Sequence, residues 1–152
     1  MINDIQARRV ACLFFGFLFF YFSPSSASDF ATISVNGHII KVEIVSTSAS
    51  QNLGLGDRNA LPKGSGMLFL YKTAGEKIFW MKRMRFAIDI IWILQGSIVH
   101  IEKNVPPPSI IHSPSRLPTY GHGIVADMVL EVSKGFADKA GLQLGDSILF
   151  WP

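Results

Sequence analysis

Cysteine is nearly absent from this chain. The 152 residues include a single cysteine, Cys12, which lies in a segment that we expect to be removed from the mature protein. A mature chain without cysteine can form no disulfide and has no thiol nucleophile. It also lacks the thiolate ligands on which many structural zinc sites depend.

Charged residues are also scarce. They make up 16% of the chain, whereas apolar residues make up 49%, and the formal net charge is +3. This balance excludes a disordered chain, and the length is sufficient for one globular domain. Lys82, Arg83 and Arg85 form a basic cluster that is too small for a nucleic-acid interface, so we expect no nucleic-acid partner.

Recognisable metal and catalytic motifs are missing as well. None of the four histidines, His38, His100, His112 and His122, is spaced from another as a metal-ligand pair requires. Ser65 lies between two glycines but lacks the strand-to-helix turn of a serine hydrolase nucleophile. No glycine motif for phosphate binding is present. We therefore predict no metal, no cofactor and no catalytic residues.

The N-terminal segment has the pattern of a secretory signal peptide. Arg8 and Arg9 precede an apolar run over residues 10–22, and small residues follow up to Ala27. Thirteen residues span about 20 Å as a helix, less than the roughly 30 Å of a bilayer core. This length favours a cleaved signal over a membrane anchor, which remains the alternative.

This pattern predicts that the chain is divided into two parts. Residues 1–27 are predicted to be the signal peptide and residues 28–152 a single domain. The mature protein would be periplasmic or secreted, and it would touch a membrane only through the N-terminal segment before cleavage.

The mature part is predicted to be mostly β. Asn36-Gly37 is a strong hairpin signal between strands at 31–36 and 38–45, because both turn positions need positive φ. Alternating or apolar runs predict further strands at 67–71, 77–82, 86–94, 97–103, 124–132 and 147–151. Short helices are expected within 46–60, capped by Ser48 or Ser50, and at 135–140. The fold class is α+β and mostly β, with a curled antiparallel sheet or barrel-like core.

Two ionisable residues lie inside the apolar centre of the chain. Lys82 shares a strand face with Trp80, and Asp89 shares one with Ile91 and Ile93. Neighbouring antiparallel strands could bring Lys82 and Asp89 together. Such a pair would either fix the strand register or serve as an acid–base pair or ligand anchor.

Aromatic and histidine side chains add further candidates. An exposed Trp80 or Trp92 would suit stacking on a sugar, although core packing is the other interpretation. His100 and Glu102 share a strand face. A loop with five prolines, at 104–123, is long enough to have a functional role.

Several short blocks carry a resemblance to a known family. The blocks are GMLF at 66–69, FWMK at 79–82, IDII at 88–91, IVHI at 98–101, VPP at 105–107, Tyr120 and VLEV at 129–132. In this order they resemble the domain of unknown function 192 family, over roughly residues 32–150. The resemblance implies a small, mostly β domain, often exported, with no established activity. The chain departs from the family pattern at Gly56, where a Met is usual, and at Arg83-Met84, where a small polar pair is usual.

We therefore predict a non-enzymatic binding or accessory protein of the cell envelope. The candidate ligand-binding residues are Trp80, Lys82, Asp89, His100 and Tyr120. The partner would be a small molecule, a sugar or an envelope protein. One alternative is a small hydrolase or carbohydrate-active enzyme that uses Asp89 and Lys82. A second is PDZ-like peptide binding, because residues 135–150 resemble the end of a PDZ domain.

Overall fold

The computed structural model describes residues 29–108 and 117–151. The elements follow in this order: β1 (Asp29–Val35), β2 (His38–Val45), α1 (Ser48–Leu53), β3 (Ser65–Glu76), β4 (Phe79–Trp80), β5 (Ile88–Leu94), β6 (Ser97–Val105), β7 (Thr119–Tyr120), β8 (Val125–Ser133), α2 (Phe136–Lys139) and β9 (Ile148–Trp151). The predicted signal peptide lies outside these residues. Within them, neither helix is long and apolar enough to cross a bilayer.

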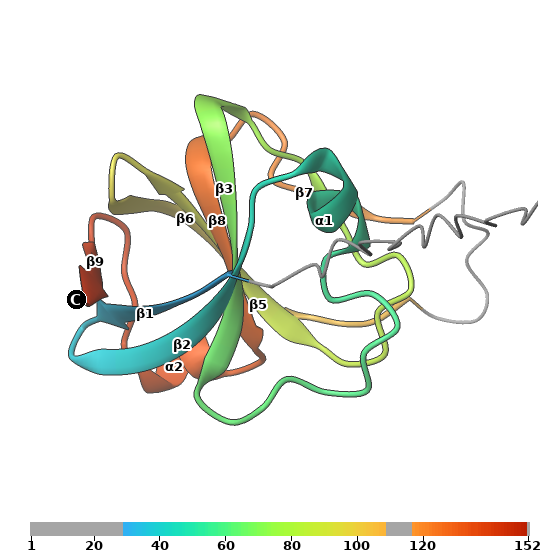
Figure 1. The fold of residues 1–152 in the computed structure, drawn as a ribbon, viewed down its shortest axis with the longest axis horizontal. Helices are drawn as coiled ribbons and strands as arrows, with labels where there is room; N and C mark the ends of the chain where they lie inside the picture. Colours follow the sequence, from blue (N-terminus) through green and yellow to red (C-terminus); the bar gives the residue numbers. More distant parts are fainter. Residues whose placement is uncertain (1–28, 109–116, 152) are drawn as a thin grey trace, which may run out of the picture.

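Seven strands form one sheet in the order β6-β5-β8-β3-β2-β1-β9, and β4 pairs with β7 in a second, two-stranded sheet. Figure 1 shows the two helices well apart, α1 near β7 and α2 near β2. The prediction of a mostly β single domain with two short helices is confirmed. The Asn36-Gly37 hairpin is also confirmed, with φ of 47° and 76° at its two turn residues.

The sheet is mixed, although we had predicted an antiparallel one. β2 and β3 run parallel, because the chain between them passes through α1 and re-enters the sheet in the same direction. The large sheet is not closed into a barrel. Its edges do meet at one corner, where the Ile98 amide donates to the Asp146 carbonyl (2.8 Å) just before β9.

The lengths of β3 and β4 differ from the predicted strands at 67–71 and 77–82. β3 continues to Glu76, beyond the predicted end of this strand at residue 71, with a register shift after Leu70. The strand predicted at 77–82 is reduced to β4, which has only β7 to pair with. Its alternation is nevertheless as predicted, since Phe79 and Met81 are buried and Trp80 is exposed.

The large sheet buries apolar side chains on both faces. On the first face, Ile91 and Ile93 pack in one cluster with Ala137 of α2. On the second face, Phe69 and Trp92 pack in another cluster that includes side chains from β4 and the segment after α1. This two-sided burial explains why β5 is apolar at every position except Asp89.

Trp92 anchors the second face. Its side chain is fully buried, and its indole Nε1 donates to the Lys77 carbonyl oxygen (2.7 Å). Gly121 lies directly against the ring with φ of 88°, and a Cβ there would be 2.6 Å from the indole Cζ2. Trp92 therefore belongs to the core, and of the two tryptophans considered for stacking on a sugar, Trp80 is the exposed one.

Candidate functional site

A cavity of about 450 Å³ opens over the second face, between α1 and β4, and we call it the α1 pocket. Its volume is typical of a site for a small organic molecule. Four aromatic side chains line it, Phe69, Tyr71, Phe79 and Trp80. Two charged side chains also line it, Lys82 and Glu131.

The short helix α1 and the segment after it form one wall of the pocket. Thr47, rather than either predicted serine, caps the helix, and Ser50 completes the capping box from the third helical position. The helix ends at Leu53, and Gly54 follows with a positive φ of 51°. The Gln51 side-chain amide donates to the Leu70 carbonyl (2.8 Å), which ties the helix to β3. The helix is thereby held beside β3, where its last three residues line the pocket.

Glu131 of β8 is an acidic residue with an unusual environment. Its side chain is 5% exposed, and its Oε2 accepts no hydrogen bond within the described residues. Burial raises its pKa to about 8, and the nearby Arg58 guanidinium opposes part of that rise. A carboxyl group with such a pKa is largely protonated at neutral pH.

Arg58 is itself bound to another carboxylate. Its two terminal nitrogens donate to the two carboxylate oxygens of Glu43, at 2.7 and 3.0 Å. Arg58 therefore acts on Glu131 through its field and makes its hydrogen bonds to Glu43.

Tyr71 is the polar aromatic residue of the pocket. Burial, followed by the negative charge of Glu131, raises its pKa to about 12, so it keeps its hydroxyl proton at any physiological pH. The Lys77 ammonium lies 4.2 Å from the centre of the Tyr71 ring. This ring already makes a cation–π contact.

Trp80 lies at the mouth of the pocket and is 50% exposed. The neighbouring Ile78 and Leu53 are also exposed, so the mouth is apolar. The Lys82 ammonium lies 5.2 Å from the centre of the Trp80 ring. An exposed tryptophan beside a cavity is suited to stacking against a ligand.

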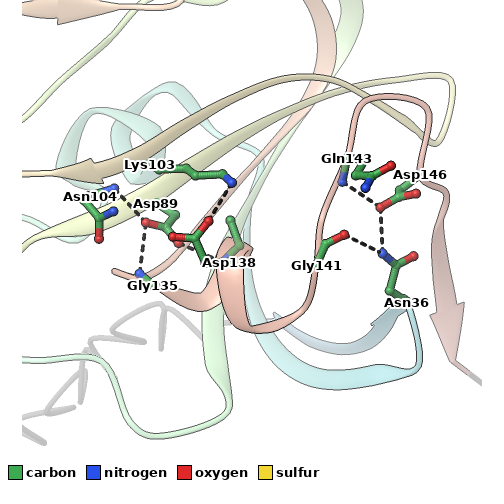
Figure 2. A network of polar contacts seen from close by, with 10 residues as sticks. Asn36, Asp89, Lys103, Asn104, Gly135, Asp138, Gly141, Gln143 and Asp146 are labelled. Atoms are coloured by element: carbon green, nitrogen blue, oxygen red, sulfur yellow. Dashed lines mark hydrogen bonds and ion pairs between the residues drawn. The ribbon is translucent and has the colours of Figure 1, made fainter.

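Asp89 lies away from this pocket. Its fully buried carboxylate accepts hydrogen bonds from the backbone amides of Asn104 (2.8 Å), Gly135 (3.2 Å) and Ala137 (2.8 Å), two of which are drawn in Figure 2. Asp89 thereby holds the start of α2 against β5 and β6. It shares the first face with Ile91 and Ile93, as predicted.

The predicted ion pair between Lys82 and Asp89 is not formed within the described residues. Lys82 follows β4, which is not a strand of the large sheet, and it lines the pocket on the second face. Asp89 is in the large sheet and its carboxylate is satisfied on the first face. The two residues never become neighbours because β4 and β5 are not adjacent strands.

His100 and Tyr120 lie in a separate place. The His100 Nε2 is 3.0 Å from the Glu102 Oε1, and its ring packs against Trp92 with centres 5.3 Å apart. Tyr120 pairs with Phe79, and burial, then Glu102, raises its pKa. Neither residue lines the α1 pocket. Among the residues that the structure describes, no group of His, Cys, Asp and Glu could hold a metal ion.

Sequence reasoning missed Glu131, although a signal was present. Glu131 is the one carboxylate in the apolar half of β8, just as Asp89 is in β5. Alternation would have placed it on the same face as the buried Val129. The cavity could not have been found in this way, because α1 and β4 contribute to it from distant parts of the chain.

The profile of a protein family, DUF192, described as an uncharacterized ACR, matches residues 31–150. Among solved structures, the chain is similar to a protein of unknown function from Novosphingobium aromaticivorans DSM 12444. That similarity has 27% identity and a TM-score of 0.72, and it covers 85% of this chain and 90% of the other. No protein with a curated description matches the chain.

A second solved structure shares the fold. It is described as a candidate transcription regulator from Sinorhizobium meliloti 1021 and is 22% identical to this chain, with a TM-score of 0.72. The match covers 81% of this chain and 95% of the other. At this identity the similarity establishes the fold alone.

Proposed function

The chain belongs to the uncharacterised domain of unknown function 192 family, and we propose that it is an exported, non-enzymatic protein that binds a small molecule in the α1 pocket. One observation carries this proposal. The cavity combines a buried carboxylate, one oxygen of which has no partner among the described residues, with an exposed tryptophan at its mouth. A mostly apolar cavity with a few polar groups inside is the usual form of a ligand site.

The arrangement supports binding over hydrolysis. The enzymatic alternative required Asp89, Lys82 and His100 within reach of one substrate. Asp89 is held by three backbone amides on the first face, and His100 pairs with Glu102 outside the pocket. Of these three residues only Lys82 lines the cavity, so the predicted catalytic group is not assembled there.

The PDZ-like alternative also has little support. A PDZ-type groove needs a helix and a carboxylate-binding loop beside the same strand edge. Here α2 packs on the first face, whereas the loop that follows α1 lines the pocket on the second face. We therefore favour a small molecule or sugar over a peptide.

Export rests on the sequence pattern of residues 1–27, which lie outside the described residues. The expected mature N-terminus is Ser28. Intact-mass measurement of the protein recovered from the periplasm or the medium tests this part, and a protein that keeps Met1 and stays in the cytoplasm would contradict it.

Ligand binding is tested by a thermal-shift screen of envelope sugars, short peptides and amines. The matched variants are Trp80→Ala and Trp151→Ala, because both tryptophans are exposed and only Trp80 lines the pocket. We expect a ligand that raises the melting temperature of the wild type and of Trp151→Ala but not of Trp80→Ala. Equal shifts in both variants, or no shift from any compound, would refute the proposal.

A further inference from the structure

We propose that the ligand of the α1 pocket is an organic primary amine, whose ammonium group binds the Glu131 carboxylate and whose organic part packs against the aromatic lining. This inference rests on the proposed function and names the ligand class for the same site. It is carried by the geometry of one buried acid and four aromatic rings.

The first step concerns the acceptor. Glu131 lines the cavity, is 5% exposed, and has an Oε2 without a hydrogen-bond partner in the described part of the chain. A buried carboxylate oxygen without a donor is unfavourable. An ammonium group would supply both the missing hydrogen bond and the opposite charge, and hydrogen bonds between charged groups are the strongest of the common kinds.

The second step concerns the rings. Phe69, Tyr71, Phe79 and Trp80 all line the pocket that contains Glu131. The faces of aromatic rings attract cations, and rings around a cavity are a known means of recognising organic ammonium groups. Two of these rings already have a lysine ammonium over them, Lys77 over Tyr71 at 4.2 Å and Lys82 over Trp80 at 5.2 Å.

The third step distinguishes primary from quaternary amines. A quaternary ammonium could use the rings but could not donate a hydrogen bond to the Glu131 Oε2. A primary ammonium has three N–H donors and can use both features. The unpartnered oxygen therefore favours a primary amine.

The other charged residues near the pocket are compatible with an ammonium group bound beside Glu131. Arg58 donates two hydrogen bonds to Glu43, which offsets its charge. Lys82 is exposed at the mouth, where solvent and salt screen its charge, whereas Glu131 lies in a low-dielectric environment. Tyr71, with a pKa of about 12, stays neutral.

A dependence on pH follows from the site. Burial raises the pKa of Glu131 to about 8, so the free protein holds a proton there that must leave when an ammonium binds. Arg58 limits that rise, and Tyr71 keeps its hydroxyl proton over the range used. For an amine that stays protonated, the affinity should rise about ninefold from pH 6 to 7 and about fivefold from pH 7 to 8, because the ionised fraction of Glu131 rises by these factors.

Isothermal titration calorimetry of the protein as expressed from its full-length gene tests this inference. The probes are two pairs that differ in the amine alone, phenethylamine with 2-phenylethanol and glucosamine with glucose. They are titrated at pH 6, 7 and 8. The variants are Glu131→Gln and Asp127→Asn. Asp127 lies on the same strand and also has an unpartnered buried oxygen, but it is outside the pocket.

We expect at least one amine to bind at least tenfold more tightly than its hydroxyl partner, with a proton released. Glu131→Gln should lose at least tenfold in affinity and the pH dependence, and Asp127→Asn should keep both. Equal binding of amine and hydroxyl compounds, or a Glu131→Gln variant that binds like the wild type, would overturn the inference and leave the proposed function in place. If no amine binds, the inference fails, and the separate screen with Trp80→Ala then decides the proposed function.

Discussion

Two buried carboxylates on neighbouring strands have opposite environments. In the ladder between β5 and β8, Asp89 pairs with Val132, and the next pair along is Ile90 with Glu131. The two acids are therefore close in the sheet but point to opposite faces. Asp89 accepts three backbone hydrogen bonds beneath α2, whereas Glu131 has an unpartnered oxygen in the α1 pocket.

The difference shows that a single acidic residue in an apolar strand can either stabilise the fold or serve as a candidate binding group. On the first face, the backbone amides at the start of α2 supply the partners that a buried carboxylate needs, so Asp89 holds the fold together. On the second face, Glu131 lines the α1 pocket with an oxygen that has no hydrogen-bond partner among the described residues, and the proposed ligand would supply that partner. Functional groups are often kept in this way at some loss of stability.

The largest expected effect comes from replacing Asp89, the acid whose carboxylate accepts three backbone hydrogen bonds. Asp89→Ala should lower the free energy of unfolding by about 4 kcal/mol, because three backbone amides lose a charged acceptor. Asp89→Asn should lose about half as much, because an amide has one acceptor oxygen and turns a donor towards one of these groups. Urea denaturation, followed by tryptophan fluorescence, measures both. An Asp89→Asn variant as stable as the wild type would mean that Asp89 has no structural role.

The second effect concerns the unsatisfied acid and depends on pH. Glu131 has a pKa of about 8 in the folded protein and 4.5 ordinarily, so the folded state binds more protons between these values. Its contribution to stability is therefore retained below about pH 4.5 and is lost progressively as the pH rises to about 8. Relative to Glu131→Gln, the wild type should lose about 3 kcal/mol between pH 5 and pH 8.

Urea denaturation of the wild type and Glu131→Gln across this range measures the difference. Asp127→Asn is the control, because it removes an acid from the same strand outside the pocket. A constant difference between the wild type and Glu131→Gln would show that the Glu131 pKa is not raised.

The smallest expected effect is that of Lys82→Met. Lys82 is exposed, and its cation–π contact with Trp80 is the one interaction of its ammonium group found in the described part of the chain. The free energy of unfolding should therefore change by no more than about 0.5 kcal/mol. The same denaturation measurement applies. A loss as large as that of Asp89→Ala would instead support the ion pair that was expected between Lys82 and Asp89.

Local patterns in the chain were informative where neighbouring residues decide the structure. The Asn36-Gly37 hairpin was predictable because its turn needs residues that accept positive φ. The alternation in β4 correctly placed Phe79 and Trp80 on opposite faces of the strand. The burial of Asp89 beside Ile91 also followed from the period of a strand.

The partners of these residues were not predictable in the same way. The sequence could not show that β4 leaves the large sheet, and so it suggested a partner for Asp89 in Lys82. It also could not show that Trp92 would be buried and Trp80 exposed, since both lie in apolar strands. These outcomes depend on which strands become neighbours, a property of contacts between distant segments.

The composition, the alternation of side chains and the blocks shared with its family thus specify a small, mostly β domain, because each depends on local geometry or on short ordered motifs. The surroundings of the two acids, in contrast, depend on contacts between distant segments of the chain. The partners of Asp89 come from α2 and β6, and the walls around Glu131 come from α1, β3 and β4. Only the folded arrangement of these segments distinguishes the acid that is held by backbone amides from the acid that the proposed ligand would bind.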